Sequence, residues 1–154
     1  MSAVVTYVET LKICRRHADR LQWSMNELEA CLPFTVESLD GVSDIQLAVL
    51  DQFASRFSRL QDAMGAKLFS AVLELTKEQG SLDAFVDKLN RLEKIGAIPS
   101  VNDWLILREM RNAFSHEYPD DPEIQVAILN KAFVLARGLI ATLTYLEIFA
   151  NRYI

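Results

Sequence analysis

Apolar residues that recur every three or four positions dominate this sequence, and they favour long helices over any other structure. From Val8 to Leu32, and again from Val49 to Leu75, these residues fall on one side of an α-helix. The chain holds only five Gly and four Pro in 154 residues, too few for the many turns of a sandwich or barrel. The spacing therefore predicts an all-α protein.

Residues that cap or break helices set the expected boundaries. In chain order these are Pro33 after the first helix, Ser43 or Asp44 at the start of the second, Gly80 and Ser81 between the second and third, Gly96 after the third, Ser100 at the start of the fourth, and Pro119 and Pro122 before the fifth. Residues 34–43 are expected to form a loop. The result is a single domain over residues 1–154, an up-and-down bundle of three long and two short helices.

Two features predict close contacts made by these helices. Gly65 lies between Ala63 and Ala66 inside an apolar stripe, where it costs about 1 kcal/mol of helix propensity relative to Ala. We expect another helix to pack closely on this shallow spot. The last helix carries two adjacent apolar stripes between Ile128 and Ala150, which predicts burial on two sides, against the bundle and against a second subunit.

Charge and residue content narrow the functional classes. A net charge of −5 counts against indiscriminate nucleic-acid binding, although it allows a small basic cleft. Cys14 and Cys31 match no metal or redox spacing, and with two histidines in the chain we expect no metal and no cofactor. Cys14 is expected to be a buried free thiol. We find no signal-peptide pattern and no apolar run of about 18 residues, so a cytoplasmic protein without a membrane span is expected.

Reactive residue types gather in one segment, residues 111–118. The fourth helix is expected to carry a polar face of four residues spaced i, i+3, i+4 and i+7: Arg108, Arg111, Asn112 and Ser115. His116 is expected in the last turn of this helix, with Tyr118 just beyond it. A histidine at a helix C-terminus is stabilised there as a cation, so His116 alone has a structural explanation. The combination of these residue types favours a site.

The pattern formed by Arg111, Asn112, His116 and Tyr118 resembles the R-x4-H-x-Y signature of the HEPN superfamily. Within it, the chain resembles the HepT-like toxins that are encoded beside MNT-type nucleotidyltransferase antitoxins. The helical layout agrees with that family over nearly the whole chain, and residues 56–62 also resemble stretches found in relatives. The resemblance implies a homodimeric, metal-independent ribonuclease. It also implies inhibition by the nucleotidyltransferase, which in some relatives attaches AMP to the tyrosine matching Tyr118.

The chemistry of these residues fits that activity. Cleaving RNA without a metal requires a base for the 2′-hydroxyl, an acid for the leaving oxygen and positive charge for the phosphorane. His116 suits the first two roles and Arg111 the third, with Asn112 fixing their arrangement and Arg108 adding charge. Two copies of His116 across a dimer axis would supply both acid and base. The Tyr118 hydroxyl could bond a phosphate oxygen, and AMP there would add bulk and negative charge.

Other polar residues have two explanations each. Arg59 and Asp62 can pair on the surface of the second helix, or together with Arg56 they line the cleft and orient Arg111 or His116. The first helix has a basic face that is either solvated or follows an RNA backbone. It consists of Lys12, Arg15, Arg16 and Arg20. His17 is expected to lie on the surface or to pair two helices.

Three functions are therefore compatible with the residues. The first is an endoribonuclease toxin acting on RNA and not on DNA, as the triplet of Arg111, His116 and Tyr118 favours. The second is a catalytically silent helical partner, or substrate-binding subunit, of a nucleotidyltransferase. The third is a plain dimerisation module.

Overall fold

The computed structural model describes residues 2–78, 84–115 and 121–154, and all regular structure within them is helical. The α-helices are α1 (Ala3–Leu28), α2 (Val36–Asp40), α3 (Asp44–Ala63), α4 (Phe69–Leu75), α5 (Phe85–Ile95), α6 (Val101–Ala113) and α7 (Pro122–Ala150). Short 3-10 turns, Glu29–Cys31 and Asn151–Tyr153, follow α1 and α7. The prediction of an all-α protein is confirmed.

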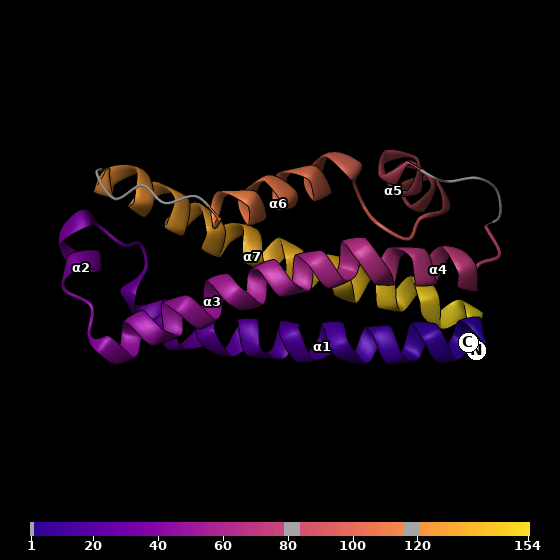
Figure 1. Ribbon diagram of the computed structural model, residues 1–154, viewed down its shortest axis with the longest axis horizontal. Helices are drawn as coiled ribbons and strands as arrows, with labels where there is room; N and C mark the ends of the chain where they lie inside the picture. The colour runs from indigo at the N-terminus through magenta and orange to yellow at the C-terminus, as the bar shows by residue number, and fades with distance from the viewer. Residues whose placement is uncertain (1, 79–83, 116–120) are drawn as a thin grey trace.

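The long helices lie alongside one another and alternate in direction. In Figure 1, α1 runs away from the end of the bundle that holds both termini, and α3 with α4 returns toward it. Helix α6 then runs away again and α7 comes back, while α5 lies beside α4 at that same end. This is the up-and-down arrangement expected from the sequence, and it places α3 between α1 and α6 on one side of the molecule.

A π-helical turn, Met64–Leu68, joins α3 to α4 into one continuous rod. Gly65 lies in this turn. A Cβ atom added to it would lie 3.4 Å from Cζ2 of Trp104 on α6 and 3.7 Å from Cζ of Phe85 on α5. The shallow spot predicted at Gly65 is therefore where the two short helices pack. The π turn itself was not expected, and such turns are frequent at functional sites.

The capping predictions at Ser43, Ser100 and Gly96 are confirmed, whereas α1 ends earlier than expected, at Leu28, and Pro122 is the first residue of α7. Ser43 begins α3 with a reciprocal capping box to Gln46, and the Ser100 hydroxyl accepts a hydrogen bond from Asp103 N at the start of α6. Gly96 closes α5 in the left-handed conformation with φ of 86°. Gly80 and Ser81 lie outside the described residues.

The prediction of a plain loop over residues 34–43 was wrong, because this segment contains the five-residue helix α2. A capping box explains it: the Thr35 hydroxyl accepts from Ser38 N, while the Ser38 hydroxyl accepts from Thr35 N. A single turn of helix is too short to produce a repeating apolar pattern, so periodicity could not reveal it.

An aromatic cluster in the core fixes the end of α6. Phe53 of α3 stacks on Phe133 of α7 with ring centroids 4.0 Å apart. Phe114, the residue that caps α6, lies edge-on to Phe53 at 6.3 Å and to Phe57 at 5.3 Å. The chain is thus held against α3 two residues before His116.

Cys14 is fully buried in α1, as its place in the apolar stripe predicted. Burial is the largest influence on its thiol and raises the pKa to about 12. Because the thiolate is the reactive form, Cys14 is an inert part of the core at neutral pH.

Helix α7 is apolar on two sides. Its inner side is fully buried at Ala132, Leu139, Leu143 and Leu146, whereas Val134 and Ile148 are 65% and 61% exposed on the outer side. Within the described ranges, Pro122–Tyr153 is also the one helix whose length and apolar character would allow a membrane span. Core helices of bundles share that length and composition, so this property does not assign a membrane location.

Candidate functional site

Arg111 is the best-positioned residue of the candidate motif. From the last turn of α6 it reaches α3, where its Nε and Nη2 atoms donate to the two carboxylate oxygens of Asp62, each at 2.9 Å. This paired hydrogen bond raises the pKa of Arg111 above its ordinary value. A bidentate pair fixes the plane of the guanidinium as well as its position.

This pairing decides between the two explanations for Asp62. The carboxylate bonds Arg111, 49 positions away, and so it positions a motif residue as the second explanation held. Arg59, which the first explanation paired with it, is exposed. Its charge acts on His17 of α1 and on Arg56, so it lies near α1 and not at Asp62.

Arg56 does not orient Arg111, because it contacts His17 of α1. Its Nη1 atom lies 2.9 Å from Nδ1 of His17. Because a guanidinium only donates, Nδ1 must accept, and His17 is neutral with its proton on Nε2. Burial, followed by the charges of Arg56, Arg59 and Arg16, lowers the pKa of His17 and favours this form. The expectation that His17 pairs two helices is confirmed.

Four arginines form a basic band across α1 and α3: Arg16, Arg20, Arg56 and Arg59. Burial and then the charges of Arg59, Arg20 and Arg16 lower the pKa of Arg56, so the four cations lie close enough to repel one another. Arg15, which the sequence placed on the same basic face, instead forms an ion pair with Glu147 of α7. Concentrating like charge on an acidic chain costs stability and creates a local field that attracts polyanions.

The rest of the motif is placed only in part. Arg108 is exposed, with its guanidinium carbon 5.4 Å from the centre of the Phe85 ring. Asn112 is also exposed, and its main-chain oxygen accepts from the Ser115 hydroxyl at 2.6 Å. Helix α6 ends at Ala113, and His116 and Tyr118 lie outside the described residues.

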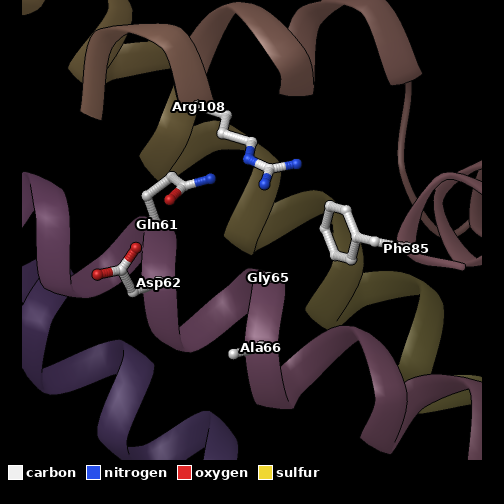
Figure 2. Close-up of a pocket in the computed structure, with 6 residues that line it drawn as sticks. All are labelled: Gln61, Asp62, Gly65, Ala66, Phe85 and Arg108. Atoms are coloured by element: carbon white, nitrogen blue, oxygen red, sulfur yellow. The ribbon is translucent and has the colours of Figure 1, made fainter. Parts of the chain in front are cut away.

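A pocket opens beside the Arg111–Asp62 pair, with a volume of about 280 Å³. Figure 2 shows the residues that line it: Gln61, Asp62, Gly65, Ala66, Phe85 and Arg108. Gln61 and Phe85 were not expected from the sequence to line a site. The sequence did contain a signal for Gln61, because this polar residue occupies a position in the apolar stripe through Phe57, Met64 and Leu68.

The described residues hold no group of three or more His, Cys, Asp or Glu that could bind a metal ion. No family model matches this chain. No curated protein and no solved structure matches it either. The candidate site is therefore defined by this chain's own residues, with Arg111, Asp62 and Arg108 brought together and Arg56 directed elsewhere.

Proposed function

We propose that this chain is a metal-independent endoribonuclease toxin of the HepT type, acting as a homodimer in the cytoplasm. In this proposal His116 is the general acid and base, and Arg111 binds the scissile phosphate and its transition state. Asn112 and Arg108 support them at the end of α6. The observation that carries the proposal is the bidentate hold of Asp62 on Arg111.

That hold leaves Arg111 suited to phosphate binding. Two N–H groups of the guanidinium bond Asp62, and the others have no partner among the described residues. A guanidinium fixed in this way can donate to a phosphate oxygen without first losing its own conformational freedom. Such preorganised donors contribute most where negative charge develops in a transition state.

The basic band supports RNA as the substrate. It spans α1 and α3, and Asp62, which holds Arg111, follows Arg59 by three residues on α3. A strand bound along these arginines would have its phosphates led toward the motif. RNA is favoured over DNA because cleavage without a metal uses the 2′-hydroxyl as the nucleophile.

An uncovered groove between α6 and α7 supports the homodimer. It encloses about 390 Å³ and is bordered by Ile106, Val134 and Tyr145, all of them exposed apolar side chains. Gly138 also lines it, and a Cβ atom there would meet nothing within 4 Å. A glycine inside a helix costs about 1 kcal/mol relative to Ala, and within the described chain nothing requires it. The close approach of a second copy would explain it.

Val134→Arg is expected to convert the dimer into a monomer and to abolish RNA cleavage, because a charge would be buried in the interface and the second His116 lost. Light scattering coupled to size exclusion measures the first effect and a cleavage assay the second. Ile45→Arg, the same change at an exposed site on α3, should leave both unaltered. A monomeric Val134→Arg variant with full activity would contradict the composite site.

Cleavage of RNA in the presence of EDTA tests the function itself. Arg111→Lys is expected to lower the rate about 10- to 100-fold, because a lysine cannot bond Asp62 and a phosphate with the same fork. Arg91→Lys is the matched control, since Arg91, on α5, forms an ion pair with Glu78 at 3.0 Å. Equal losses in both variants would reduce Arg111 to a structural role.

The proposed antitoxin is an MNT-type nucleotidyltransferase, with Tyr118 as the residue it would modify with AMP. The antitoxin could block RNA binding by covering the basic band directly. AMP attached to Tyr118 would block it by adding bulk and negative charge. A silent partner subunit of such an enzyme is the alternative, and it would need neither the fixed Arg111 nor a cleft for RNA.

A further inference from the structure

The pocket beside Arg111 is lined by an amide, an aromatic ring and a guanidinium, and phosphate binding does not explain this combination. It lies between the π turn that follows α3, the first residue of α5 and the outer side of α6. In Figure 2, the side chains of Gln61 and Arg108 approach each other from facing helices, and the Phe85 ring reaches in from α5. Gly65 lies beneath them, without a side chain to fill the space.

Gln61 is the feature that most needs explaining. Its side chain lines the pocket although the residue is only 5% exposed, and its amide makes no hydrogen bond with any described residue. The amide atoms are not among the fully buried atoms that lack a partner in the described residues, so they open to the pocket. An amide held by a nearly buried side chain and open to a cavity offers both a donor and an acceptor to a polar group bound there.

Phe85 and Arg108 supply flat surfaces beside this amide. The guanidinium of Arg108 lies 5.4 Å from the centre of the Phe85 ring, and Arg108 is exposed on a flexible stem. It can move outward so that a planar ligand stacks on the ring with the guanidinium on its other side.

We propose that this pocket binds one unpaired nucleobase of the RNA. A base offers two aromatic faces for Phe85 and Arg108, and an edge with adjacent donor and acceptor atoms for the Gln61 amide. The Asp62 side chain borders the pocket and also holds Arg111, so the bound base would belong to a nucleotide next to the scissile phosphate. Placing the base next to the scissile phosphate rests on the proposed function, whereas binding of a base in the pocket does not.

Nuclear magnetic resonance of the whole protein tests the pocket. Titration with AMP, CMP, GMP or UMP at millimolar concentration is expected to shift the main-chain amide signals of Gln61, Gly65 and Phe85. Ribose 5-phosphate, which carries the sugar and the phosphate without a base, should leave these signals in place. If none of the four nucleotides shifts them, or if ribose 5-phosphate shifts them equally, the proposal is overturned.

Two variants separate binding from folding. Gly65→Ala places a methyl group on the pocket floor at ordinary contact distance from Trp104, so it should lower nucleotide affinity while the Tm holds or rises. Gln61→Leu should lower affinity about 3- to 10-fold, the usual contribution of a neutral hydrogen bond. Gln22→Leu, an exposed position on α1, is the matched control and should bind as the wild type does. Unchanged affinity in both pocket variants would refute the site.

The outcomes for the pocket and for the nuclease differ. If the protein binds nucleotides at Gln61 but cuts no RNA, the proposed base pocket stands and the proposed ribonuclease activity is refuted. If the protein cuts RNA, Gly65→Ala leaves the cleavage rate unchanged and no nucleotide binds, the ribonuclease activity stands and the base pocket is refuted.

Discussion

Replacing His116 with Ala is expected to lower the rate of RNA cleavage by about 10²–10⁴-fold, the usual contribution of a general acid or base. In cells, expression of the wild type should arrest growth, and expression of the variant should not. The loss should exceed that of Arg111→Lys, because a lysine keeps a positive charge whereas alanine keeps no titratable group. The rate is measured on purified protein with EDTA present.

The control for His116→Ala is Asn102→Ala, an exposed residue near the start of α6. It should cleave at the wild-type rate and arrest growth equally. If the wild type itself is harmless and cuts no RNA, the silent-partner alternative gains. Co-expression with the neighbouring nucleotidyltransferase then distinguishes further, since mass spectrometry would detect AMP on Tyr118 only where that residue is a target.

Phe53→Ala is expected to lower the free energy of unfolding by about 3–5 kcal/mol, which corresponds to a fall in Tm on the order of 10 °C. Phe53 is fully buried, and it contacts Phe57, Phe114 and Phe133. Its removal leaves a cavity among rings from three helices that cannot all move inward together. Thermal unfolding followed by circular dichroism measures the change.

Tyr153→Ala provides the comparison, because Tyr153 is 45% exposed near the C-terminus. Its effect should stay within about 0.5–1 kcal/mol. Phe53→Ala should also reduce cleavage below the unfolding temperature, since Phe114 loses one of the rings that hold the end of α6. A cavity variant with normal cleavage would show that the cluster stabilises the bundle without positioning the motif.

Much of the fold followed from the sequence because its signals are local. The apolar stripes located the long helices, and the start of α3, the start of α6 and the end of α5 were each marked by one capping residue: Ser43, Ser100 and Gly96. Helix α2 and the π turn escaped because neither changes the apolar period over a window long enough to detect.

The site was less predictable because its contacts join separate helices. Spacing places Asp62 within reach of Arg59 on the same helix, but it cannot give the roll of α3 against α6 that brings Asp62 to Arg111. The same holds for Arg56 and His17, which are 39 positions apart. The polar face with Arg108 and Arg111 was expected, and its partners could only be found once the helices were packed.

The π turn at Met64–Leu68 has a consequence for how this chain can vary in length. A π turn holds one more residue than an α turn, so removing a single residue there would restore regular hydrogen bonding with little rotation of α4 relative to α3. A deletion in the α-helical parts of the rod has no extra residue to remove, so it would rotate the following segment by about 100° and turn its apolar side toward water. The rod can therefore lose one residue at the π turn, whereas a loss within α3 or α4 requires the helices around it to repack.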